Sequence, residues 1–590
     1  MTRKEAKTAA RRTLRGHWAL LVGLCLLGAL LGGEWAASVT AAKTLRTQSL
    51  PTLETAALPM EWDMARRLIQ LAQDPQGAAE QFYAQEEELA QSGGAILGRS
   101  RGEIARWLNK LQSGAYMADA LEPLAALTLS QTAGLILLAL LCGALILFVW
   151  VFLKGVYRVL VCRMALECRI YQKVPGGRLF WLGRVKRLGR VAWCMAARTL
   201  AVALWSLTVV GGVARYCAYF PVPYLLAENP GLDRRQAMAL SERMMAGHKG
   251  DLFRFELSFL GWKVLSVATF GLSGALWSRP YRQAALAHYY TALRAQWLAG
   301  HPEDRALLND PWLFDVPEEG ALSSAYGDLP AEEPLPRLAG TVGWAARNFG
   351  LLLRQGPREL AYAQALEDRA RLAPVRLEAR GLQYPARLAP HKPEKDQAVD
   401  TDPVRCYGLW SVVALFFAFS MAGWLWEVFY TSVDTGQFIN RGVLHGPWLP
   451  IYGSGACMIL LALYRFRTRP ALEFFAAIAL CGVLEYGTGL YLELVHGQRW
   501  WDYVGYFLNL HDRISAEGLL AFGIAGMAAV YALAPWLDNL LRRLPRRVLT
   551  AMCVALVALF LADQLWSALV PNVGPGITDI TAGVARIAVR

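Results

Sequence analysis

The stretch "LWSVVALFFAFSMAGWLWEVFY", residues 409–430, contains one charged side chain, the carboxylate of Glu427. A transmembrane helix needs roughly 20 mainly apolar residues, so this stretch is long enough to cross a bilayer. Acids inside membranes are rare, and they mark either a helix contact or a functional site. The position of Glu427 therefore raises the question of what this carboxylate does.

Similar apolar runs occur along the whole chain. Hydrophobic residues make up 55% of the sequence and charged residues 18%, whereas soluble proteins average about 45–50% and about 25%. Nine of these runs are long enough to be candidate spans. Two shorter apolar pieces, 213–227 and the one after Gly271, would complete hairpins and raise the number of spans to eleven. We therefore expect an all-α, polytopic integral membrane protein with about nine to eleven helices. The nine candidate spans are 17–33, 133–153, 191–212, 256–277, 407–431, 447–464, 470–492, 515–534 and 549–569.

The distribution of Lys and Arg predicts the sidedness of these spans, because both accumulate on cytoplasmic loops. Six bases precede the first apolar run, and eleven lie between Lys154 and Arg198, so both segments are expected inside. Residues 36–130 carry eleven acids against eight bases, as expected of an exported loop. The N-terminal run, with its bases and the small residues of "WAASV", also fits a signal peptide.

The chain divides into two membrane domains. We expect an N-terminal domain over 1–298 and a five-helix domain over 405–570, joined by a Pro- and charge-rich cytoplasmic linker over 299–404. Two basic clusters orient the second domain and leave a short tail, 571–590, outside; the clusters are Arg465, Arg467 and Arg469, and Arg542, Arg543, Arg546 and Arg547. Because the N-terminus and the linker are both inside, the first domain holds four or six crossings.

Several classes of protein are excluded by what the sequence lacks. "GGAILGRS" has Arg99 where a phosphate-binding loop requires Lys, and it lies in the exported loop, so we expect no ATPase in this chain. The positive charge is explained by topology and does not indicate nucleic-acid binding. None of the ten cysteines lies in the exported loop, so no disulfide framework is expected. Without a metal spacing or a nucleophile elbow, neither an enzyme nor a cofactor is predicted.

The five helices of the second domain suggest a polar site near their outer ends. Glu485 lies only about 6 Å from the centre of its helix at a rise of ~1.5 Å per residue, and it needs a partner at that depth. The span 447–464 enters through "HGPWLPIYGSG", which makes a regular helical start unfavourable. One hypothesis is an outward-facing cavity that binds a substrate; the alternative is that Trp, Tyr or Arg donors satisfy each acid and fix helix packing. The candidate residues are Glu427, Glu485, Asp563, Arg441, His445 and Arg513.

The C-terminal half resembles a family of bacterial ABC-transporter permeases of the CmpB type. The resemblance covers about 405–570 and rests on "FSMAGWLWEVFYTSVDTGQFINRGVLHGPWLPIYGSGA", "LEYGTG", "RWWDY" and "NLHDRIS", with Asp512 where the family is expected to have Gly. It implies an outer-rim motif formed by Gly423, Trp424, Gly446, Pro447, Trp501, Asp502 and Tyr503.

The N-terminal half resembles a second bacterial membrane family, domain of unknown function 975. The resemblance covers roughly 3–296 and rests on "KEAKTAARRTLRGHW", "PYLLAENP" and "SERMMAGHKGDLFRFELSFLGW", with a larger exported loop than that family is expected to have. Together, the two resemblances imply a multi-pass protein of the bacterial plasma membrane. The distribution of Lys and Arg predicts that its N-terminus is cytoplasmic and its C-terminus outside.

The function expected from these observations is that of a permease-like transport component without its own ATPase, whose partners are the lipid bilayer and a separate ATPase subunit. The alternative is a membrane scaffold or regulator that does not transport and whose exported loop, 36–130, binds a partner.

Overall fold

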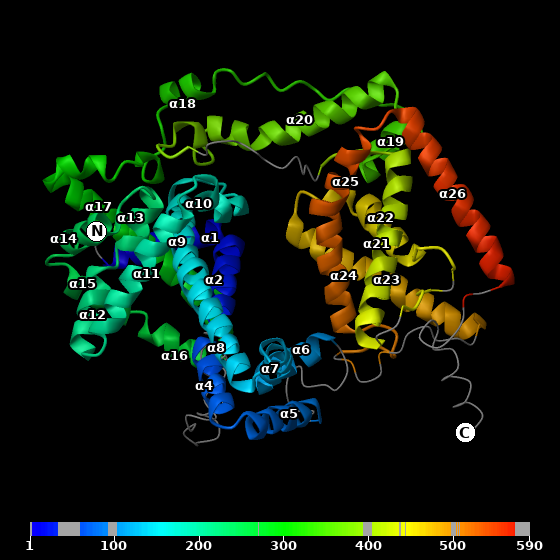
Figure 1. The fold of residues 1–590 in the computed structure, drawn as a ribbon. Coiled ribbons are helices and arrows are strands. Elements are labelled where there is room, and N and C mark those ends of the chain that lie inside the picture. Colours follow the sequence, from blue (N-terminus) through cyan, green and yellow to red (C-terminus); the bar gives the residue numbers. More distant parts are fainter. Residues whose placement is uncertain are drawn as a thin grey trace. The chain divides into compact units, whose positions relative to one another are not determined.

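The computed structural model describes residues 3–32, 60–91, 103–269, 271–392, 404–435, 438–442, 444–496, 503, 506, 508–570 and 572. These residues are mostly helical and include almost no strand, which confirms the all-α class (Figure 1). The chain divides into two compact units: unit 1 comprises Met1–Phe82, Gly114–Pro330 and Pro374–Asp396, and unit 2 comprises Tyr83–Ser113, Ala331–Ala373 and Gln397–Arg590. The boundaries fall within helices α5 (Pro75–Gln91) and α20 (Pro357–Ala379).

Five helices in the described ranges are long and apolar enough to cross a membrane. Their outward faces are apolar; Leu140 and Leu559, for example, are 66% and 59% exposed. Apolar side chains on the surface of a long helix are stable in lipid, so the chain is embedded in a membrane. The five are Gln131–Ile170, Leu409–Phe429, Pro470–Tyr491, Ala516–Leu541 and Arg546–Leu569, and two shorter apolar helices cover Trp18–Ala29 and Pro450–Ala462.

Unit 1 is built from many short helices around one long one, the continuous run α8–η1–α9. Its elements begin with α1 (Arg3–Gly16), α2 (Trp18–Gly32), α4 (Met60–Gln73), α7 (Ala115–Thr128), α8 (Gln131–Phe148), η1 (Val149–Gly155), α9 (Val156–Ile170), η2 (Gly176–Phe180), α10 (Trp181–Arg184), α11 (Leu188–Trp205) and α12 (Val209–Ala218). They continue with α13 (Val222–Glu228), α14 (Arg234–Met244), α15 (Lys249–Leu257), α16 (Leu260–Ala268), η3 (Gly274–Ser278), α17 (Arg279–Gly300), η4 (Pro302–Ala306), η5 (Pro311–Leu313), α18 (Glu319–Tyr326) and η6 (Ala386–Leu388).

Unit 2 contains four of the five long spans. Its elements are α6 (Glu103–Ser113), α19 (Gly340–Phe349), β1 (Leu351–Leu352), β2 (Tyr407–Gly408), α21 (Leu409–Thr435), α22 (Pro450–Ala462), η7 (Tyr464–Phe466), α23 (Pro470–His496), α24 (Ala516–Ala528), η8 (Ala529–Leu533), α25 (Ala534–Leu541) and α26 (Arg546–Leu569). β1 and β2 pair in parallel, which ties the segment before α20 to the start of α21. Helix α21 packs against α22 and α26, and α23 packs against α24.

Two of the apolar runs counted as single spans are not single helices. The run 191–212 is divided by a turn at 206–208 between α11 and α12, and the run 256–277 is divided between α15, α16 and η3. The hydropathy of a window depends only on which side chains it contains, so it does not reveal a turn inside the window. The prediction that each of these two runs is one continuous span was therefore wrong.

The core of unit 1 lies where α9, α13 and α17 meet α1. Val159, Met164, Leu225 and Ala284 are fully buried there. Part of the expected linker joins this core, since Leu313 and Tyr384 are 0% and 1% exposed. Residues 299–404 are therefore divided between the two units, with 299–330 and 374–396 in unit 1 and 331–373 and 397–404 in unit 2.

Candidate functional site

The helix α22 starts regularly at Pro450, in contrast to the irregular start expected from its glycines and prolines. Proline is favoured in the first turn, where its missing N–H leaves no hydrogen bond unmade. Gly453 and Gly423 instead allow α22 and α21 to approach closely, because a Cβ at Gly453 would lie 2.2 Å from Ser420 Oγ and one at Gly423 would lie 2.3 Å from the Tyr452 ring. The irregular backbone lies before the helix, in the described parts of 438–449.

Glu427 lies one helical turn after Gly423 and is held by two donors. The hydroxyl of Tyr452, whose ring packs on Gly423, donates to Glu427 Oε1 at 2.7 Å. Arg441 Nε lies 3.3 Å from Glu427 Oε2, and both side chains are about one-third exposed, at 31% and 30%. The Trp424 indole donates to Asn440 Oδ1 at 2.6 Å. Helix α21 thus anchors the loop before α22 through both Glu427 and Trp424.

Asp563, on α26, holds the other end of the same loop. Its carboxylate accepts the backbone N–H groups of His445 and Gly446 at 3.2 and 3.0 Å and the Trp448 indole N–H at 2.7 Å. The His445 ring lies 3.0 Å from Ser567 Oγ, one turn further along α26. A carboxylate that accepts three N–H groups is well compensated for its desolvation, so Asp563 positions the loop.

Glu485 differs from both of these acids. Its Oε1 accepts the Tyr503 hydroxyl at 2.7 Å, but its Oε2 is buried and has no hydrogen-bond partner among the described residues. Tyr503 lies within electrostatic range of Tyr452, the donor to Glu427, so the two acids lie in the same region of unit 2. Burying a carboxylate oxygen without a donor is costly, which makes Glu485 the most unusual of the predicted residues.

Of the two predicted arginines, Arg441 contacts the predicted acid Glu427, whereas the partner of Arg513 was not among the predicted site residues. Arg513 pairs with Glu493 and not with Glu485, and its guanidinium lies 5.6 Å from the Tyr486 ring. The exposed Pro447 follows Gly446 in the anchored loop. Trp501 and Asp502 lie outside the described residues. Among the residues that the structure describes, no three potential metal ligands gather in one place.

Four residues that complete these clusters were not predicted from the sequence, namely Asn440, Trp448, Tyr452 and Ser567. The pair Gly423 and Glu427 at i and i+4 was visible, but nothing local indicated that Tyr452 would pack across it. Asp512, where the family was expected to have Gly, adopts a positive φ of 56°. This conformation favours glycine and is tolerated by Asp, so the substitution is compatible with the turn.

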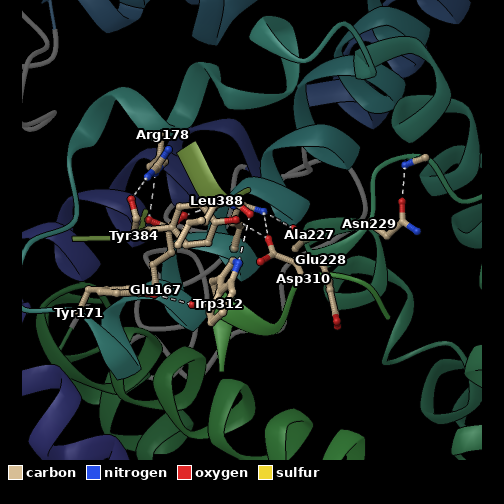
Figure 2. A network of polar contacts seen from close by, with 12 residues as sticks. Glu167, Tyr171, Arg178, Ala227, Glu228, Asn229, Asp310, Trp312, Tyr384 and Leu388 are labelled. Atoms are coloured by element: carbon tan, nitrogen blue, oxygen red, sulfur yellow. Dashed lines mark hydrogen bonds and ion pairs between the residues drawn. The ribbon is translucent and has the colours of Figure 1, made fainter. Parts of the chain in front are cut away.

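A second polar cluster lies in unit 1 and was not predicted. Arg163 on α9 contacts Glu167 at 3.2 Å and Asp310 at 3.5 Å, and it donates to the carbonyl of Ala227 at 2.7 Å. The Tyr384 hydroxyl donates to Asp310 Oδ2 at 2.7 Å. Figure 2 shows these groups converging from α9 and from the segments around 310 and 384. The cluster therefore fixes parts of the expected linker to unit 1.

The pair Glu228 and Arg294 extends this buried network. Arg294 Nε lies 2.9 and 3.1 Å from the two carboxylate oxygens of Glu228, which is 0% exposed. Burial raises the pKa of Glu228 to about 7, and the adjacent Arg294 opposes that shift. The pair holds α13 against α17, which is a structural role.

Two family models match the chain. Residues 414–568 match the ABC_trans_CmpB family, described as "Putative ABC-transporter type IV". Residues 121–297 match DUF975, described as "Protein of unknown function". No curated protein and no solved structure matches the chain. The two matched regions confirm the resemblances expected from the sequence: the C-terminal half is similar to the CmpB-type family and the N-terminal half to DUF975.

Proposed function

We propose that the chain is a permease-like component of a transporter in the bacterial plasma membrane. In this proposal the chain is not an enzyme, and a separate ATPase subunit supplies any ATP-driven step. The observation that carries the proposal is Glu485, a carboxylate within a long apolar span with one buried oxygen unpaired among the described residues. An ionisable group at that depth is costly for insertion and is a functional-site candidate by default.

The surroundings of Glu485 support this role. The anchored loop before α22 places non-helical backbone beside the Glu427–Tyr452 pair, and such backbone at membrane depth is tolerated where protein or a water-filled cavity covers it. Asp563 and Glu427 hold the loop, while Glu485 has bonding capacity left for a polar or cationic group of a solute.

The proposal is tested by uptake into proteoliposomes of the full-length chain. The probes are a radiolabelled amino acid, a sugar, a polyamine and an inorganic cation, each assayed with and without the product of any neighbouring ATPase gene. Glu485→Gln should abolish uptake while incorporation and oligomeric profile stay unchanged. Glu517→Gln, at the start of α24, is the matched control and should retain uptake.

Equal uptake by the Glu485→Gln and Glu517→Gln variants would contradict a transport role for Glu485. A Glu485→Gln chain that fails to incorporate would show that the residue serves packing, and Tyr503→Phe then separates the two cases. If Glu485 is functional, Tyr503→Phe should alter the uptake rate without changing incorporation, because it removes the donor and keeps the ring.

A scaffold role is the second candidate. The described part of the expected exported loop is folded: α4, α5, α7 and α8 share a buried cluster that includes Leu71, Phe82, Met117 and Leu138. On α6, Trp107 and Leu111 lie one turn apart and are 64% and 46% exposed. Under this role, deleting 36–130 should remove partner capture and leave membrane insertion intact, and retained capture would count against it.

A further inference from the structure

The two apolar runs that turn back on themselves in unit 1 have a common geometry. In the first, α11 is followed by a turn at 206–208 and by α12. A Cβ at Gly212 would lie 2.8 Å from the Cα of Ser206, so the two arms touch directly at the turn. In the second, α16 is followed by η3, and a Cβ at Gly274 would lie 2.2 Å from Ser266 Oγ. Each run is therefore a tight helical hairpin.

The base of the first hairpin is fixed by a hydrogen bond between its arms. Arg198 Nε donates to the carbonyl of Tyr219 at 2.9 Å. Before Arg198, α11 is part of the core, with Val191 and Met195 at 0% and 1% exposed. A Cβ at Gly155 would lie 3.1 Å from Met195 Cβ, so α11 contacts the long α8–η1–α9 helix at Gly155. The apolar stretch of that helix ends at the neighbouring Lys154, and the base of the hairpin therefore lies at the same level.

Beyond its base the first hairpin is apolar and exposed. It extends about 13–16 Å from Arg198 and Tyr219 to the turn, at ~1.5 Å per residue. The hydrocarbon core of a bilayer is roughly 30 Å thick, so the hairpin is long enough for about half of it. The side chains around the turn are exposed: Leu200 54%, Leu204 59%, Trp205 49%, Leu207 86%, Val209 81% and Val210 82%.

The second hairpin repeats this arrangement. Phe259 and Tyr281 join its arms at the base, with ring centroids 5.6 Å apart. Two cations of α1 lie on these rings, since Lys7 Nζ is 4.6 Å from the Phe259 centroid and the Arg11 guanidinium is 5.9 Å from that of Tyr281. Helix α16 extends only about 14 Å past the base, at ~1.5 Å per residue. Its exposed side chains are Leu260 53%, Val264 64%, Leu265 43%, Leu272 55% and Leu276 43%.

We infer that both hairpins are re-entrant: they enter the bilayer from the cytoplasmic side, reach about its middle and return to the same side. Cations mark the cytoplasmic face at both bases, with Lys186, Arg187 and Arg190 near the first and the α1 cations at the second. The exposed Lys263 lies one turn past the second base, from where a lysine reaches the interface. The N–H groups of Ser206, Leu207 and Thr208 donate to carbonyl groups of α11, so the backbone of the first turn is hydrogen-bonded within the hairpin. Because its side chains are apolar and exposed, lipid is the occupant that fits this turn.

This arrangement has a consequence for topology. The first domain then crosses the membrane only with α2 and α8, and the segment between the hairpins, 219–257, lies on the cytoplasmic side. Four full crossings would export that segment, and six would bring both turns to the outer surface. The three arrangements therefore differ at two observable places, the segment around Gly250 and the turn at Leu207.

The first experiment determines the side of the intervening segment. Gly176→Cys, in the loop between α9 and α11, and Gly250→Cys, on α15, are introduced separately into the full-length chain. Both glycines are exposed, and a Cβ at either meets nothing within 4 Å. An impermeant maleimide should label both variants in inside-out vesicles and neither in intact cells, above the background of the unmodified chain. Labelling of the two from opposite sides would overturn the inference.

The second experiment measures the depth of the turn. A nitroxide at Leu207→Cys in lipid nanodiscs should collide more with dissolved oxygen than with an aqueous nickel complex, as one at Leu140→Cys on α8 does. Preferential collision with nickel would overturn the inference, because the turn would then lie in water on one side or the other. Protection from both agents would also overturn it, since protein and not lipid would then cover the turn.

Discussion

The buried network of unit 1 and the acids of unit 2 use the same side chains in different ways. In unit 1, Arg163, Glu167 and Glu228 are 1%, 0% and 0% exposed, and each has charged partners within hydrogen-bonding range. In unit 2, Glu427 is 30% exposed, and Glu485 has one oxygen unpaired among the described residues. A closed network fixes chain segments to one another, whereas an acid with remaining bonding capacity can take part in recognition.

The largest effect on stability is expected when Arg294 is removed from the buried network of unit 1. Arg294→Ala should lower the free energy of unfolding by about 3–5 kcal/mol at pH 8, because the buried Glu228 must then either stay ionised without a counter-charge or take up a proton. The effect should be smaller at pH 5, where Glu228 is protonated, since its pKa is about 7. Urea unfolding in detergent micelles measures this difference, with the exposed Arg305→Ala as the control that should change little. A similar loss in both variants would show that the network adds nothing.

A smaller effect is expected at the acid that anchors the loop of unit 2. Asp563→Ala should lower the free energy of unfolding by about 1.5–3 kcal/mol, because it removes the acceptor of three N–H groups. Asp563→Asn keeps one acceptor oxygen, so its free energy of unfolding should lie between those of the unmodified chain and of Asp563→Ala. Gln564→Ala, at an exposed neighbouring position, is the control. If Asp563→Ala leaves stability unchanged while altering uptake, Asp563 belongs with Glu485 as a functional acid.

The third prediction concerns how the stability of unit 1 depends on pH. Burial, with a contribution from Arg169, lowers the pKa of His288 to about 4, and its ring lies 3.0 Å from Thr13 Oγ1, which joins α1 to α17. Between pH 6.5 and 4 the unfolded chain binds a proton that the folded chain excludes, so stability should fall as the pH falls through this window. Thermal unfolding between pH 7 and pH 5 measures how steeply the stability falls with pH. His288→Gln should reduce this dependence, and an unchanged dependence would show that other groups cause it.

The smallest effect is expected at Glu427. Glu427→Gln should change the free energy of unfolding by less than about 1 kcal/mol, because the ion pair with Arg441 is partly exposed and the amide oxygen can still accept the Tyr452 hydroxyl. Tyr452→Phe should cost more, since the buried part of the carboxylate then loses its neutral donor. A loss with Glu427→Gln as large as that with Asp563→Ala would place Glu427 among the anchoring residues.

Much of the membrane architecture was predictable from the sequence. The long spans of unit 2 and the run 133–153 appear as helices close to their expected positions. Hydropathy predicts such helices well, because insertion depends on a sum over about twenty neighbouring side chains. The turns were predicted only in part. The break after Gly271 was visible in the sequence, and Gly271 adopts a positive φ of 86° there, but the turn at 206–208 lies inside the apolar window 191–212, where hydropathy gives no signal for it.

The candidate site was predictable only in part. Glu427, Glu485 and Asp563 were identified because a carboxylate in an apolar run is conspicuous, but their partners were not. Trp448 reaches Asp563 from 115 residues away, and Tyr452 meets Glu427 across the α21–α22 contact. Pairing Arg513 with Glu493 instead of Glu485 likewise depends on how the loop before α24 folds back.

By itself, the sequence determined the membrane class of the protein, the positions of its long spans and the family resemblance of each half, because these depend on local composition and short motifs. Only the tertiary structure decided which apolar runs turn back, which donors meet the intramembrane acids and which parts of the linker join the core of unit 1. These outcomes depend on contacts between residues far apart in the chain, and such contacts leave no signal in any local stretch of sequence.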